Sequence, residues 1–168
     1  FTLNGRAVSV QTVAGQSLLG VLREGCGLRS MKDGCAPEGS CGACTVIVDG
    51  HAVVSCARPA ERAEGRTVET LEGLPDDVRR AWADAFVATG ASQCGYCSPG
   101  IVMKAEALLR RDPAPAREMV AKTLAGNLCR CTGYASIIEA IELVAARRRG
   151  EAEAPAGDGA AAPAGTRA

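Results

Sequence analysis

Short runs of alternating apolar and polar residues dominate the first part of the chain, and this pattern is typical of strands. Residues 2–8 hold an Asn-Gly step between two apolar runs, which predicts a tight hairpin. Residues 45–48 and 52–55 are joined by an Asp-Gly step and predict a second hairpin. Residues 67–70 add one more candidate strand. The pattern therefore predicts a small mixed sheet that ends near Gly73.

One helix and one irregular segment interrupt these strands. Residues 17–23 predict a short helix, with Ser17 as the residue that caps its first turn. Residues 24–43 are rich in Gly, Ser and Pro, so no regular element is expected there.

The second half of the chain changes to a helical period. Apolar residues recur at intervals of three and four positions, so each predicted helix has a single apolar face. Ser98 and Pro99 form a strong helix start, with Ser98 as the capping residue and Pro99 in the first helical position. Four such helices predict a compact bundle. The predicted helices are 76–89, the segment from Ser98 that carries Ile101 to Leu109, about 116–125, and the segment that carries Ile137 to Ala145.

Together these patterns predict an α+β protein with two domains. Residues 1–73 form the β-rich N-terminal domain, and residues 74–149 form a C-terminal domain similar to a four-helix bundle. From Gly150 onward the chain is rich in Ala, Gly and Pro, so residues 150–168 are expected to be a flexible tail or a linker.

Composition narrows the class of function. Aromatic residues make up only 3% of the 168 residues, so the core must rely on aliphatic side chains. The 19 basic and 19 acidic residues give a formal net charge of zero, which argues against nucleic acid or an anionic membrane as the main partner. No apolar run approaches the roughly 18 residues of a membrane span, and no secretion signal is visible. The chain begins with Phe rather than Met, which leaves its natural start open.

Nine cysteines are many for a chain of this length, and they lie in tight groups. A secreted disulfide framework is one interpretation. The odd count, the absent secretion signal and spacings of one or two residues between neighbouring cysteines favour metal ligation instead.

One set of four cysteines lies in the β-rich half, and its first three members share a glycine-rich loop. Glycines allow the backbone to approach a cluster closely and to point N–H groups at its sulfur atoms. Plant-type [2Fe–2S] proteins place four residues, then two, between the first three cysteines, before a distant fourth. The first gap here has five residues, a one-residue expansion of that pattern. The set is Cys35, Cys41, Cys44 and Cys56.

The second set lies in the helical half, as two pairs that each precede a predicted helix. If those two helices pack side by side, the four thiolates converge where two helix N-termini meet. Both helix dipoles would then stabilise the negative charge of a thiolate-ligated cluster. Arg130, between the last two members, could add a compensating positive charge. The set is Cys94, Cys97, Cys129 and Cys131.

The residues alone leave structural zinc open, since two CxxC pairs can form a Cys₄ site. The glycine-rich loop, the two complete sets and the Cys-x-Cys pair favour iron–sulfur clusters over zinc. A Rieske centre needs two histidines, and the chain has only His51, interpreted as a solvated hairpin residue. Cys26 is left over and is interpreted as a small buried apolar residue.

Five short motifs resemble those of one family. Residues 33–35, 39–46 and 55–56 read DGC, GSCGACTV and SC, which resembles the plant-type ferredoxin domain (a β-grasp fold) of the molybdenum hydroxylases. Residues 93–100 and 127–134 read QCGYCSPG and NLCRCTGY, which resembles the second cluster domain of the same family. The family includes xanthine oxidase, aldehyde oxidases and carbon monoxide dehydrogenase. The resemblance extends over most of the chain, up to the predicted tail.

The resemblance implies a small subunit that carries two [2Fe–2S] clusters on the eight grouped cysteines and has no substrate-converting site of its own. A large subunit with a molybdenum–pterin cofactor would hydroxylate the substrate with oxygen from water. Electrons would then pass through the cluster of the helical domain and that of the ferredoxin domain to a medium subunit that binds FAD, or to another acceptor. The resemblance also implies that Gln93 contacts the pterin and that Cys131 lies near it. A cytoplasmic location is expected, with export of the assembled complex left open.

Two other functions stay open at this point. A free-standing two-cluster ferredoxin could serve several partners, although a diffusing carrier has no need of a second cluster in a helical domain. A zinc-stabilised interaction module would be colourless and would hold no iron.

Overall fold

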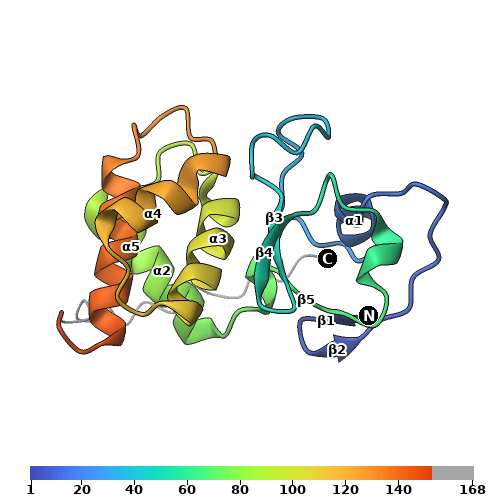
Figure 1. Ribbon diagram of the computed structural model, residues 1–168, viewed down its shortest axis with the longest axis horizontal. Helices are drawn as coiled ribbons and strands as arrows, with labels where there is room; N and C mark the ends of the chain where they lie inside the picture. The colour runs from blue at the N-terminus through green and yellow to red at the C-terminus, as the bar shows by residue number, and fades with distance from the viewer. Residues whose placement is uncertain (153–168) are drawn as a thin grey trace, which may run out of the picture.

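The computed structural model describes residues 1–152, in which a five-stranded sheet stands beside a group of helices (Figure 1). The strand order is β2-β1-β5-β3-β4, with β1 and β5 parallel and the other neighbours antiparallel. Both predicted hairpins, the added strand and the α+β class are confirmed. The predicted tail lies outside the described residues from position 153 onward. The strands are β1 (Thr2–Leu3), β2 (Arg6–Ala7), β3 (Thr45–Val48), β4 (His51–Val54) and β5 (Thr67–Glu69).

Both hairpin turns use the backbone geometry that their residues favour. Asn4 and Gly5 have φ values of 50° and 80°, and Asp49 and Gly50 have φ values of 47° and 80°. Two successive positive φ values are typical of the type I′ turn, whose twist matches that of the flanking strands. Asp49 also accepts a hydrogen bond of 2.8 Å from the N–H of Thr67, which ties the second hairpin to β5.

The short helix begins as predicted and then widens. α1 (Leu18–Gly20) follows Ser17, whose Oγ accepts a hydrogen bond of 3.2 Å from the N–H of Gly20. The chain continues as a π-helical turn over Val21–Gly25, and the N–H of Cys26 closes it with a bond of 3.0 Å to the carbonyl of Val21. The helical segment therefore extends beyond its predicted end, with wider hydrogen bonding in its last part.

Four longer helices form the C-terminal half, as predicted. Three of them bury one apolar face each in a shared core that includes Trp82 and Phe86, whereas the helix that begins at Ser98 is buried on nearly all sides because the sheet covers it as well. A 3₁₀ turn (Leu124–Gly126) follows the third of them. No helix among residues 1–152 is long and apolar enough to cross a membrane. The helices are α2 (Asp76–Thr89), α3 (Ser98–Arg111), α4 (Arg117–Thr123) and α5 (Ala135–Arg148).

Cys97, not Ser98, is the capping residue of α3, so that prediction is wrong by one position. The carbonyl of Cys97 already accepts the N–H of Ile101 at 3.1 Å, so helical hydrogen bonding begins one residue earlier than expected. The Oγ of Ser98 instead lies 3.4 Å from that of Ser92. A cysteine of the second set therefore occupies the helix start itself, where the first N–H groups lack helical partners.

Strand β3 is buried on both faces because it contributes to two cores. Val46 and Val48 pack with α1 and the other strands, whereas Ile47 packs with the helices of the C-terminal half. The ribbon shows α3 running alongside β3 and β4 (Figure 1). The helical half therefore covers one face of the sheet, and the two halves share an apolar contact.

Close backbone contacts join the first cysteine loop to the helical half. A side chain at Gly100, in the first turn of α3, would overlap the carbonyl oxygen of Gly42. A side chain at Gly42 would in turn overlap the carbonyl of Gly126 and the amide of Asn127. Asn127 is only 3% exposed, and its Nδ2 donates to the Gly42 carbonyl at 3.1 Å and to Thr45 Oγ1 at 3.3 Å. Both glycines are needed because backbone meets backbone here.

A buried carboxylate adds a second link between the halves. Glu106 accepts hydrogen bonds from Trp82 Nε1 at 2.8 Å and Arg110 Nε at 3.0 Å, and Arg148 donates to the same carboxylate. Arg110 also forms a two-bond ion pair with Glu69 of β5, at 2.9 and 3.0 Å. Burial opposes the ionisation of Glu106, but these donors outweigh it and lower its pKa. The network holds three helices against β5.

Gly100→Ala is expected to destabilise the protein by about 1–3 kcal/mol, because the added methyl group meets backbone that cannot rotate away. Gly126→Ala is the matched control, since a methyl group there meets no atom within 4 Å. Urea unfolding of the cluster-loaded variants measures the difference. Equal unfolding midpoints for the two variants would contradict the close contact at Gly42.

Candidate metal centres

The first set of cysteines lies in the loop before β3 and directly after β4. Cys44 and Cys56 are buried, whereas Cys35 and Cys41 are partly exposed. The N–H of Cys56 donates to the Sγ of Cys44 at 3.4 Å. The thiols of Cys44 and Cys56 lie close enough to interact electrostatically, and so do those of Cys35 and Cys41. The structure therefore brings the four predicted side chains together as two pairs.

Left-handed turns wrap this loop around its sulfur atoms. The φ value is positive at Ala36, Gly39 and Gly42, at 48°, 71° and 68°. A side chain at Gly34 would place its Cβ 3.0 Å from the Sγ of Cys41. Since only glycine leaves room for such an approach, this geometry agrees with the prediction that the loop's glycines bring backbone close to the site.

The two ends of this set differ in how readily their thiols ionise. A hydrogen bond from the backbone N–H of Cys41 lowers the pKa of Cys35 to about 6. Burial raises the pKa of Cys56 to about 12. Because a metal ligand must be the thiolate, loading this site displaces the proton that Cys56 holds at neutral pH.

The second set converges between the N-termini of α3 and α5, as predicted. The Sγ atoms of Cys94 and Cys131 lie 3.4 Å apart. The thiols of Cys97 and Cys129 lie close enough to interact electrostatically. Cys94 and Cys131 are exposed, whereas Cys97 and Cys129 are partly buried. This set is also two pairs, and each pair joins one residue before α3 to one before α5.

Local hydrogen bonds set the ionisation of the second set. The backbone N–H of Tyr96 lowers the pKa of Cys94. Burial raises the pKa of Cys97 to about 12. Burial also opposes ionisation of Cys129, but hydrogen bonds from the hydroxyl and backbone of Thr132 outweigh it and lower that pKa.

Residues around the second set hold its loop in place, and the sequence patterns did not single them out. The hydroxyl of Tyr134 accepts the N–H of Cys129 at 2.9 Å and donates to the carbonyl of Asn127 at 3.1 Å. Thr132 Oγ1 lies 3.1 Å from the Sγ of Cys129. The N–H of Leu128 donates to the carbonyl of Cys41 at 2.9 Å, which connects the two cysteine loops directly. Their only signal in the sequence is their place in the NLCRCTGY motif.

The remaining candidates lie apart from the two sets or at their edge. Gln93 is exposed beside Cys94, and its side chain forms no hydrogen bond with any residue of 1–152. Arg130 is exposed. Cys26 packs against the core of the sheet but is only partly buried, not fully buried as predicted, and this partial burial raises its pKa. His51 is exposed at the start of β4.

The donor chemistry of both sets fits a two-iron cluster. Each set offers four thiols arranged as two pairs, and in a [2Fe–2S] cluster with four thiolates each iron takes two of them. Among residues 1–152, no three His, Cys, Asp or Glu side chains gather around one point as ligands of a single ion. The role of the eight cysteines as ligands stays a prediction that the pairing supports.

Two protein-family descriptions match consecutive parts of the chain. Residues 1–71 match a 2Fe-2S iron-sulfur cluster binding domain, and residues 70–142 match a [2Fe-2S] binding domain. Together they cover both cysteine sets.

Several characterised proteins are similar over nearly their whole length. The nicotinate dehydrogenase small FeS subunit of Eubacterium barkeri is 45% identical, over 86% of this chain and 92% of that protein. The nicotine 6-hydroxylase small subunit of Paenarthrobacter nicotinovorans is 43% identical, over 83% and 84%. The xanthine dehydrogenase iron-sulfur-binding subunit of Escherichia coli O157:H7 is 44% identical, over 83% and 89%.

Solved structures of related enzymes are also similar to this chain. The aldehyde oxidoreductase of Desulfovibrio desulfuricans superposes with a TM-score of 0.84 and 42% identity, over 89% of this chain and 17% of that longer protein. A chain of quinoline 2-oxidoreductase from Pseudomonas putida 86 superposes with a TM-score of 0.82 and 42% identity, over 90% of this chain and 95% of that one.

The fold, the two four-thiol sites and these likenesses define a protein with two [2Fe–2S] domains. More specifically, the chain belongs to the small iron–sulfur subunits of the molybdenum hydroxylases. It is the electron-transfer subunit of a dehydrogenase or hydroxylase complex with larger partner subunits. The predicted family, fold class, cluster type and electron-transfer function are confirmed, and a molybdenum cofactor and FAD in partner subunits fit this family.

Cys41→Ser and Cys94→Ser are each expected to lose about half of the bound iron, because each removes a thiolate from a different set. Cys26→Ala is the control and should keep the wild-type iron content. Iron analysis and visible absorption measure the loss. Wild-type iron content in either serine variant, or a loss of iron in Cys26→Ala, would show that the cysteines are assigned to the two sets incorrectly.

Proposed function

We propose that electrons enter this subunit at the exposed second set and leave at the first set, with four cysteines of each set holding one cluster. The clusters, when bound, each accept and release one electron. The ligands on the entering side are Cys94, Cys97, Cys129 and Cys131, and those on the leaving side are Cys35, Cys41, Cys44 and Cys56.

The observation that carries transfer between the two sets is the hydrogen bond of 2.9 Å from Leu128 N–H to the carbonyl of Cys41. Leu128 precedes Cys129, so one hydrogen bond and a few covalent bonds connect a residue of the second set to a residue of the first. The Asn127 contact to Gly42 holds the same two loops in register. The chain's own contribution is therefore to keep two redox sites close and fixed.

We propose that the molybdenum–pterin subunit docks at the face that carries Cys94 and Cys131. Both cysteines are exposed, and the large apolar side chains of Tyr96 and Leu128 beside them are 46% and 56% exposed. Gln93 lies on the same loop with an amide that has no partner in residues 1–152. A free amide can both donate to and accept from a pterin ring, so Gln93 is proposed to contact it.

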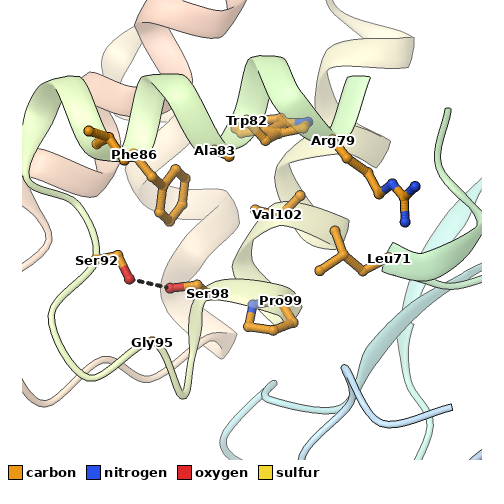
Figure 2. Close-up of a pocket in the computed structure, with 11 residues that line it drawn as sticks. Leu71, Arg79, Trp82, Ala83, Phe86, Ser92, Gly95, Ser98, Pro99 and Val102 are labelled. Atoms are coloured by element: carbon orange, nitrogen blue, oxygen red, sulfur yellow. Dashed lines mark hydrogen bonds between the residues drawn. The ribbon is translucent and has the colours of Figure 1, made fainter. Parts of the chain in front are cut away.

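An apolar cavity continues this face. It has a volume of about 390 Å³ and lies between α2 and the start of α3. Figure 2 shows Trp82, Phe86 and Val102 lining it, with Ser92 and Gly95 of the Gln93 loop at one end. Apolar surface of this kind next to exposed ligands supports contact with a protein partner rather than with solvent.

The surface around the first cysteine set supports contact with a second partner. Residues 36–38 of the first cysteine loop are exposed, and Cys35 is partly exposed behind them. We propose that an FAD-binding medium subunit, or another acceptor, approaches here.

We further propose a cytoplasmic location, because eight free thiols require a reducing compartment until the clusters are loaded. The division into residues 1–73 and 74–149 is likewise proposed, and the separate apolar cores on either side of β3 support it.

The proposed direction is tested with the assembled complex and the isolated subunit. Substrate of the complex is expected to reduce both clusters, seen by electron paramagnetic resonance, only when the molybdenum subunit is present. Dithionite should reduce them in either sample. A subunit that purifies alone with both clusters, and binds neither partner when mixed with it, would instead support a free carrier.

Gln93→Ala is expected to slow reduction of the clusters by substrate about tenfold, because one hydrogen bond at the interface is lost. Iron content and reduction by dithionite should not change. Gln11→Ala is the matched control, since Gln11 is an exposed glutamine outside both cysteine sets. Stopped-flow absorption measures the rates. Identical rates in Gln93→Ala and Gln11→Ala would contradict the proposed contact of Gln93 with the pterin.

A further inference from the structure

A polar cavity of about 290 Å³ lies where β4, α3 and α4 meet, away from the apolar cavity of Figure 2. β4 and α4 lie on either side of α3 (Figure 1). The cavity is lined by His51, Ala52, Lys104, Arg111, Lys122 and Thr123.

The cavity gathers cations that the fold does not neutralise. The chain has three lysines and one histidine, and two of the lysines and the histidine line this cavity. Neither Lys104 nor Lys122 forms an ion pair or a hydrogen bond with residues 1–152, and no carboxylate lines the cavity. Among residues 1–152, Arg111 donates only from Nε, to the carbonyl of Ala107 at 3.2 Å. Several positive charges thus face one space without a counter-charge.

The hydrogen-bond donors that line the cavity determine which ligands it can bind. Ammonium and guanidinium groups donate hydrogen bonds and accept none, and the Thr123 hydroxyl can add another donor. A partner must therefore offer acceptor oxygens with negative charge. Carboxylates and phosphates both meet this requirement.

The position of the cavity points to a partner protein. β3 begins directly after Cys44, and His51 follows the turn at its other end, so the cavity lies at the end of the sheet away from the cysteine loop. It is therefore outside the face proposed for electron transfer. A subunit of a multi-subunit enzyme with an overall net charge of zero has no general need for such a patch. Charge complementarity with a partner subunit explains it.

We propose that this cavity is an anchoring site for an acidic segment of a partner subunit, whose Asp or Glu carboxylates bind Lys104 and Lys122. The inference rests on the proposed assembly of this chain with larger subunits. The anchor contributes to assembly and takes no part in electron transfer.

Three double variants test this in the co-expressed complex. Lys104→Gln with Lys122→Gln is expected to weaken assembly at least about tenfold, because partner carboxylates lose their charged donors. Lys104→Arg with Lys122→Arg keeps the charges and should retain assembly. Arg6→Gln with Arg80→Gln removes two exposed arginines elsewhere and is the control. Iron content should be unchanged in all three. Unchanged assembly of the glutamine variant would overturn the proposal.

Carbodiimide coupling of the wild-type complex adds a direct readout. It joins a lysine amine to a carboxylate in contact with it, and Lys32 serves as the internal reference. Coupling of Lys104 or Lys122 to a partner Asp or Glu supports the anchor. Coupling at Lys32 alone contradicts the anchor. Pyrophosphate binding to the isolated chain also contradicts it, if the double glutamine variant loses that binding but still assembles with its partners. Failure of the wild-type subunits to assemble at all would count against the proposed function instead.

Discussion

The buried amide of Asn127 is the contact on which the rest of this structure depends. It donates to the carbonyl of Gly42 at 3.1 Å, inside the first cysteine loop, while its own backbone lies two residues before Cys129. The contact is possible only because Gly42 and Gly100 carry no side chain. A buried amide without a partner would cost about 1–3 kcal/mol, so the two loops hold each other in place. The contact thereby joins the two cysteine loops into one unit.

Around this contact, the sheet and the helices are joined twice more. Ile47 extends from β3 into the helical core, and Glu106 with Arg110 connects three helices to β5. Rigid packing of this kind suits electron transfer, because the chain must hold its redox sites at a constant separation and in a constant environment. The surfaces proposed to meet partners lie at the cysteine loops and at the lysine-lined cavity.

Local patterns in the sequence were sufficient for the elements and for the grouping of the cysteines. The Asn-Gly and Asp-Gly steps predicted both hairpins, and the positions of Cys97 and Cys129 before helices predicted their convergence. The long-range contacts were not predictable, because nothing local marks Asn127 as the partner of Gly42 or gathers Lys104 with Lys122. The predicted cap of α3 was one residue too late. Serine is a stronger capping residue than cysteine, which favoured Ser98, but the helix begins at Ser98 itself and Cys97 is its cap. Family resemblance supplied what spacing could not, namely the expectation of a molybdenum partner and of a pterin contact at Gln93.

The most direct measurement is electron paramagnetic resonance of the fully reduced protein, wild type against Asn127→Ala. If the amide of Asn127 holds the two loops together, the wild type will show magnetic interaction between its two clusters. The variant, with unchanged iron content, will show a weaker or more variable interaction. Two non-interacting signals in the wild type, or identical splitting in the variant, would contradict the account.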